Sequence, residues 1–170
     1  ARAAGRPQLK WSAVDGASKY WIYRSTDGVN YKYYDTTTKT SYLNKSTAVG
    51  TTYHYKVRAV AVVNGQNVAS AYSGAKSLLV STAAPSAKIT TSNGKPKISW
   101  NAVSGATKYW IYRSTDGINF SYWDSTTRTN YTNTGAKKNT KYYYRVKSVK
   151  VVNGKNIASA YSNTVSVKAK

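Results

Sequence analysis

The sequence repeats itself at a spacing of 89 residues without a gap. A shift by that spacing aligns Trp11 with Trp100, Trp21 with Trp110 and Tyr72 with Tyr161, and roughly half the positions in 7–81 are identical to their counterparts. The spacing is well above the roughly 20 to 50 residues of a solenoid repeat, so it indicates a duplicated domain. We therefore predict two domains, 1–82 and 88–170, joined by a short linker of small residues and one Pro at 83–87.

Each copy consists of short alternating segments separated by turn residues, and helical periodicity is absent. Residues 53–58 alternate strictly, and 20–24 with the counterparts 109–113 and 142–147 are expected to place successive side chains on opposite faces of a strand. Asp27-Gly28 and Asn64-Gly65 are dipeptides suited to tight turns with positive φ, the second closing a hairpin onto 68–72. This pattern predicts an all-β protein built of two antiparallel β-sandwiches.

The chain is strongly basic, which limits the partners that it can attract. It has 26 Lys and Arg against five Asp and no Glu, giving a formal net charge of +21 and a pI of about 10.1. Such a charge favours polyanions as partners. There is no Cys, so disulfides and thiolate metal sites are excluded, and the apolar runs are too short for a membrane span or a signal-peptide core. A start at Ala1 fits a mature or excised fragment.

Several blocks of both copies resemble fibronectin type III domains, particularly those of secreted and cell-surface proteins of Gram-positive bacteria. The residues that carry the resemblance are Trp11 and Trp100, the block ATKYWIYRSTDG at 106–117, GTTYHYKVRAV at 50–60, and SAYS at 70–73 and 159–162. The resemblance covers essentially the whole chain and implies two tandem immunoglobulin-like sandwiches outside the cell. It also implies that Tyr53 and Tyr142 form the tyrosine corner that ties a strand to the preceding loop.

Two features depart from that family. No Arg-Gly-Asp occurs in the loop between the sixth and seventh expected strands, which here is a tight Asn-Gly turn, so integrin-style recognition is not supported. The first copy begins with residues 1–6 where the second has Lys88 to Thr91, so its first strand is expected to be short or irregular.

The chain lacks the residue patterns of catalytic, metal and phosphate-cradling sites. The only His is His54, and its counterpart is Tyr143. The Asp residues occur singly: Asp27 and Asp116 begin turns, and Asp35 and Asp124 share one repeat position, which does not make a catalytic pair or a calcium site. The Gly residues are scattered in turns. We therefore predict no enzymatic activity, no metal and no cofactor.

Alternation identifies the candidate binding surface. If Tyr20, Ile22, Tyr53 and Tyr55 point to the core, the intervening side chains face solvent on two neighbouring strands. The candidate ligand-binding residues are Trp21, Tyr23, His54, Lys56 and Arg58, with Trp110, Tyr112, Tyr143, Arg145 and Lys147 in the second copy. Aromatic rings beside cations can stack on sugars or bases while the cations hold phosphate, sulfate or carboxylate groups. The same pattern is explained equally by cross-strand pairs that only stabilise the sheet, or by packing against a neighbouring domain.

Three further features have structural interpretations. Trp11 and Trp100 lie on the predicted core face. Trp123, the counterpart of Tyr34, lies near a sheet edge, where both a structural and a ligand-binding role stay open. Lys137, Lys138 and Lys141 form a cationic loop that the first copy lacks, which by default is a solvated loop.

Four hypotheses follow. The first is a bacterial surface or secreted segment that binds anionic polysaccharide or wall polymer such as teichoic acid, or a host extracellular glycan or protein. The second is an accessory carbohydrate-binding module of a polysaccharide-degrading enzyme. The third is a purely structural linker. The fourth, nucleic-acid binding, is permitted by charge and aromatic content but has no supporting motif.

Overall fold

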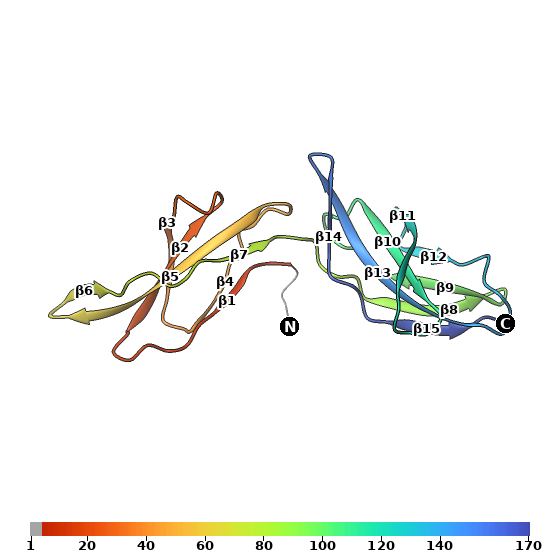
Figure 1. Ribbon diagram of the computed structural model, residues 1–170, viewed down its shortest axis with the longest axis horizontal. Coiled ribbons are helices and arrows are strands. Elements are labelled where there is room, and N and C mark those ends of the chain that lie inside the picture. Colours follow the sequence, from red (N-terminus) through yellow and green to blue (C-terminus); the bar gives the residue numbers. More distant parts are fainter. Residues whose placement is uncertain (1–4) are drawn as a thin grey trace. The chain divides into compact units, whose positions relative to one another are not determined.

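The computed structural model describes residues 5–170, and every helix or strand in this range is a β-strand (Figure 1). The chain divides into two compact units, Ala1–Val80 and Ser81–Lys170. Residues 83–87, expected as a linker, lie within the second unit: Ala83 packs against its core, and the buried Ala87 begins a strand. The predicted fold class is confirmed, because both units are antiparallel sandwiches.

The second unit packs a three-stranded sheet against a five-stranded one. The smaller sheet has the order β12 (Asn130–Thr132), β9 (Lys95–Trp100) and β8 (Ala87–Ser92). The larger contains β11 (Ser121–Thr126), β10 (Lys108–Ser114) and β13 (Lys141–Val152), with β14 (Lys155–Ala158) and β15 (Val165–Lys168) both pairing with β13.

The first unit repeats this arrangement with a smaller first sheet. Its five-stranded sheet contains β3 (Lys32–Thr37), β2 (Lys19–Ser25) and β5 (Thr52–Val63), with β6 (Gln66–Ala69) and β7 (Lys76–Leu79) on β5. Within residues 5–80, the other sheet consists of β1 (Gln8–Lys10) and β4 (Ser41–Leu43). The expected irregular first strand falls on residues 1–6, of which 1–4 lie outside the described residues.

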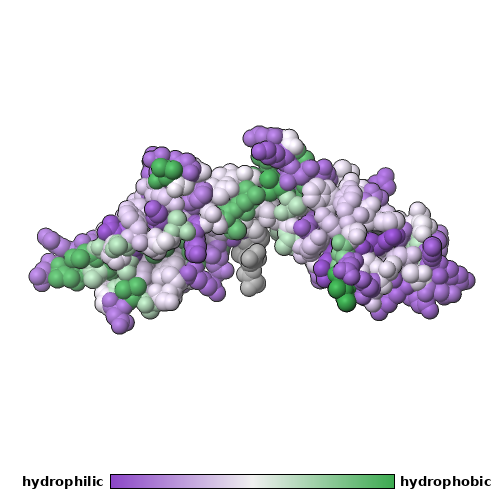
Figure 2. Space-filling view, viewed as in Figure 1, coloured by the Kyte–Doolittle hydropathy of each residue, from purple (hydrophilic) through white to green (hydrophobic). Residues whose placement is uncertain are grey.

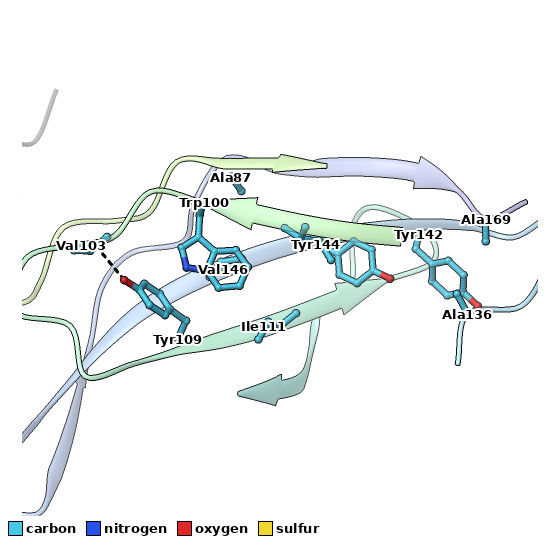
Figure 3. Packing of buried hydrophobic residues seen from close by; sticks show 11 residues of the cluster. Ala87, Trp100, Val103, Tyr109, Ile111, Ala136, Tyr142, Tyr144, Val146 and Ala169 are labelled. Carbon is cyan, nitrogen blue, oxygen red and sulfur yellow. Dashed lines mark hydrogen bonds between the residues drawn. The ribbon is translucent and has the colours of Figure 1, made fainter. Parts of the chain in front are cut away.

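Alternation along the long strands fills the core of the second unit (Figure 3). Tyr109 and Ile111 of β10 point inward with Tyr142, Tyr144 and Val146 of β13, and Trp100 of β9 packs on the Tyr109 ring at a centroid distance of 5.3 Å. Trp11 makes the same contact with Tyr20. The structural interpretation of both Trp residues is therefore confirmed.

Buried Tyr hydroxyls tie the strands to the loops. The Tyr53 hydroxyl accepts a hydrogen bond from the Ala48 amide, five residues upstream, and Tyr142 accepts one from Lys137, which confirms the predicted tyrosine corners. The hydroxyl of Tyr144, also on β13, accepts a hydrogen bond from the Asn133 side chain at 2.8 Å. Burial raises the pKa of the Tyr144 phenol to about 12, because the anion would lose its hydration.

The last strand of each unit is split in two, and a Ser-x-x-Ser segment joins the halves. The prediction that the strand runs through 68–72 is wrong at its end, because β6 stops at Ala69. Beyond it, the Ser70 and Ser73 hydroxyls accept hydrogen bonds from the Ala59 and Val57 amides of β5. Side-chain oxygens thus replace backbone carbonyls as acceptors, and the chain can bulge without leaving donors unpaired.

Candidate functional site

The candidate surface is the solvent-facing side of each five-stranded sheet, here called the outer face. Trp21 and Tyr23 of β2 lie directly opposite Arg58 and Lys56 of β5 in the strand register, and none of the four is buried. In the second unit, Trp110 pairs with Lys147 and Tyr112 with Arg145. The predicted aromatic and cationic residues therefore do lie together, once in each unit.

The rings on this face contact one another edge to face. Tyr33 of β3 lies between Trp21 and Tyr23, with ring centroids 6.3 and 6.0 Å away, and Tyr72 lies 4.9 Å from Tyr23 on the other side. The second unit repeats these distances almost unchanged with Trp110, Tyr112, Tyr122 and Tyr161. Such pairs stabilise the sheet by about 0.5–1.5 kcal/mol each beyond the area that they bury.

A bulge explains how β3 presents a ring to this face. The pairing of β2 with β3 shifts between Ile22 and Tyr23, so that Tyr23 pairs with Tyr33 and Tyr34 is the additional residue. The Tyr34 ring lies beneath the Arg24 guanidinium, whose central carbon is 3.8 Å from the ring centroid. The counterpart Trp123 is covered in the same way by Arg113 and donates its indole N–H to Tyr131. Trp123 therefore stacks with Arg113 near the edge of the sheet and is not part of the outer face.

Cations alternate with the rings of the outer face. The Lys56 ammonium lies 4.3 Å from the Tyr31 centroid, and the Arg58 guanidinium lies 4.9 Å from Tyr72 while donating to the carbonyls of Ser70 and Ala69. In the second unit, Arg145 lies 4.0 Å from Phe120 and Lys147 lies 4.1 Å from Tyr161. Lys and Arg therefore exchange places between the units, while the alternation of ring and cation is kept.

His54 and Tyr143 occupy the end of the outer face and are covered by a turn. A Cβ placed on Gly28 would approach the His54 ring to 3.2 Å, and one on Gly117 would approach the Tyr143 ring to 3.0 Å. These two half-buried candidates therefore pack against the backbone of a turn.

The structure adds aromatic residues that were not among the predicted candidates. Tyr33 and Tyr72 are 55% and 49% exposed, and their counterparts Tyr122 and Tyr161 are 55% and 39% exposed, whereas Trp21 and Trp110 are partly covered by Tyr33 and Tyr122. The available signal was that both copies carry Tyr at each of these positions. Tyr72 also belongs to the SAYS block, whose bulge turns that ring onto the outer face.

Asp27, Asp116 and Asp35 have structural partners. The Ser25 hydroxyl, followed by the Asn30 side chain and the amides of Asn30 and Val29, holds the pKa of Asp27 well below its usual range. Ser114 and Asn119 do the same for Asp116. Asp35 accepts a hydrogen bond from the Tyr42 hydroxyl. Within residues 5–170, no three His, Cys, Asp or Glu side chains are grouped so that they could hold a metal ion.

None of residues 5–170 form a helix long and apolar enough to cross a membrane.

Comparison with known proteins identifies the fold. No family model and no curated protein matches the sequence. Among solved structures, a two-domain fibronectin type III segment of chicken tenascin is 14% identical, with 98% of this chain and 93% of that chain covered and a TM-score of 0.52. The chicken interferon gamma receptor alpha chain is 9% identical, with 98% and 97% covered and a TM-score of 0.60. The chain therefore has the fold of two fibronectin type III domains in tandem.

Proposed function

We propose that this chain is an extracellular binding module, part of a bacterial cell-surface or secreted protein, whose outer faces bind an anionic polysaccharide or wall polymer. The observation that carries the proposal is the alternation of half-exposed rings with Lys and Arg on the outer face, present in both units. Sugar rings stack on exposed aromatic faces, and the neighbouring cations attract the acidic or sulfated groups of the same polymer.

The charge of the chain supports an anionic ligand. With +21 overall, long-range attraction raises the local concentration of a polyanion near either unit. Two copies of one weak site on a single chain then bind a long polymer more tightly than either alone, since the second contact is intramolecular. The extracellular setting rests on the fold, which the tenascin segment shares.

One specific observation favours a structural role instead. Arg58 lies on Tyr72 and hydrogen-bonds two carbonyls, and Trp21 and Tyr23 both contact Tyr33, so part of this surface is used within the sheet. A spacer whose outer face is stabilised in this way would need no ligand. The same surface on a polysaccharide-degrading enzyme would make the chain an accessory carbohydrate-binding module.

The proposal is tested by removing the two most exposed rings. We expect the full chain to bind heparin, used as an acidic sulfated probe, at low salt, and the variant Y33T/Y122T to bind about tenfold more weakly, because each unit loses a ring on which a sugar can stack. The measurement is isothermal titration calorimetry at two salt concentrations, with circular dichroism to confirm folding.

The variant V29T/I118T is the matched control, because it removes two exposed apolar side chains from the Asp-Gly turns and leaves every ring of the outer face in place. It should bind heparin as the unmodified chain does. Equal affinity of Y33T/Y122T and the unmodified chain would reject ring stacking. No binding of the unmodified chain to heparin or to wall polymer at low salt would favour the spacer.

A further inference from the structure

Five Lys residues gather at one end of the second unit. They are Lys95, Lys137, Lys138, Lys141 and Lys168, here called the lysine end; four are exposed and Lys95 is half-buried. This end lies near the C-terminus marked in Figure 1, where Figure 2 shows hydrophilic residues covering the surface. The five residues come from three segments that are far apart in the sequence.

Backbone contacts hold these segments together. Lys141 of β13 lies directly opposite Lys168 of β15. The Asn139 amide donates to the Ala169 carbonyl, which joins the loop before β13 to the end of β15. The Lys95 ammonium donates to the carbonyl of Ala136, next to Lys137, at 2.8 Å. The lysine end is therefore a defined part of the folded unit rather than a set of independent side chains.

The charges at the lysine end are not compensated within these segments. No Asp occurs in 93–95, 133–141 or 165–170. Like charges directly opposite on two strands destabilise a sheet, and Lys141 and Lys168 are such a pair. The repeat shows that the fold does not require this pair, because the residues at the same positions in the first unit are Thr52 and Leu79.

The lysine end also contributes to a difference in net charge between the two units. Fifteen of the 26 Lys and Arg and two of the five Asp lie in 81–170, so the second unit carries +13 and the first +8. Lys137 and Lys138 correspond to Ala48 and Val49 in the first unit. The first unit thus has the same fold and an outer face of its own, but no lysine end.

We infer that the lysine end, which adjoins the outer face at Tyr143, is a second binding site for a linear polymer of phosphate groups recognised by charge alone. The Tyr142 ring beside Lys137 is buried, and the half-buried Tyr143 ring, with the Lys141 ammonium 5.1 Å from its centroid, packs against Gly117. All five cations are Lys, which acts as a flexible point charge, whereas the planar fork of Arg favours bidentate partners. Closely spaced phosphates can pair with several of these Lys ammonium groups at once, and this contact requires no aromatic ring.

The test uses inorganic polyphosphate, which has neither sugars nor bases, as the probe for the full chain. The variant K137A/K138A/K141T/K168S removes four Lys of the lysine end, and K10S/K32S/K39S/K45T removes four exposed Lys of the first unit, so both carry +17. We expect at least about tenfold weaker binding for the first variant and less than about threefold for the second. The slope of log affinity against log salt should also fall by about 0.7–0.9 for each phosphate that the first variant no longer neutralises.

Three outcomes would overturn the inference: equal losses in the two charge-matched variants, absence of polyphosphate binding at low salt, or tighter binding of single-stranded DNA or heparin that responds to the same four substitutions. Y33T/Y122T separates this inference from the proposed function. That variant should lose heparin affinity and keep polyphosphate affinity, and loss of both would place the phosphate contacts on the outer face.

Discussion

At the scale of single residues, the turn between β10 and β11 shows how one Gly serves both the backbone and the packing. Gly117 follows Asp116 and has a φ of 78°, a conformation that costs other residues about 1–2 kcal/mol. It also leaves room for the Tyr143 ring, which a Cβ would approach to 3.0 Å. The sequence predicted the positive φ from the Asp-Gly pair, but not the contact with a ring 26 residues away.

We therefore expect G117A to destabilise the second unit by about 2–3 kcal/mol. The matched control is G154A, which has a φ of 76° and no atom near its Cβ, so it should lower the free energy of unfolding by only about 1 kcal/mol. Urea unfolding of both variants gives the difference. In a Y143A background the excess of G117A over G154A should disappear; if it persists, the contact with Tyr143 is not its cause.

At the scale of elements, the split last strand orients the outer face. From the pair Val149–Ala158 to the pair Tyr144–Val165, β13 moves five positions while its partner moves seven, so two residues are additional. The hydroxyls of Ser159 and Ser162 satisfy the amides of Ser148 and Val146 across this bulge. The SAYS blocks thus have a definite structural role: they turn Tyr72 and Tyr161 toward the rings of β2 and β10.

The two units allow a direct comparison of this Ser-x-x-Ser bulge. We expect S162A to destabilise the second unit by about 1–3 kcal/mol, because it leaves the buried Val146 amide without a partner. Its counterpart S73A should destabilise the first unit by at most about 1 kcal/mol. Ser73 is exposed, so water can replace its hydroxyl as the acceptor for the Val57 amide. Thermal unfolding of both variants tests this, and equal losses would show that burial does not set the effect.

At the scale of the whole molecule, the two copies have the same fold but hydrophobic cores of different size. Eleven buried residues form the core cluster of the second unit, against four within residues 5–80 of the first unit: Ile22, Tyr53, Tyr55 and Val80. In the second unit β9 pairs with both β8 and β12, whereas in the described part of the first unit β1 pairs only with β4. Leu78 of β7, which pairs with the buried Tyr53, remains 40% exposed.

Because buried apolar area is the main source of stability, we expect the first unit of this chain to unfold before the second on heating. Calorimetry should resolve two transitions, and hydrogen exchange read by mass spectrometry should show amides of β2 and β5 exchanging before those of β10 and β13. A single transition, with both sets of amides exchanging together, would contradict this expectation.

The resemblance to fibronectin type III domains implied the tyrosine corners. The sequence pattern alone was sufficient for the class of fold, the duplication and the inward or outward direction of Trp21, Tyr23, Lys56 and Arg58. These depend on alternation with a period of two and on turn residues, which are local properties of the chain. It did not show that Tyr33 and Tyr72 are the most exposed rings of the outer face, or that Lys168 lies opposite Lys141. Those positions depend on the bulges and on pairing between strands distant in the sequence, so only the tertiary structure could decide which side chains meet.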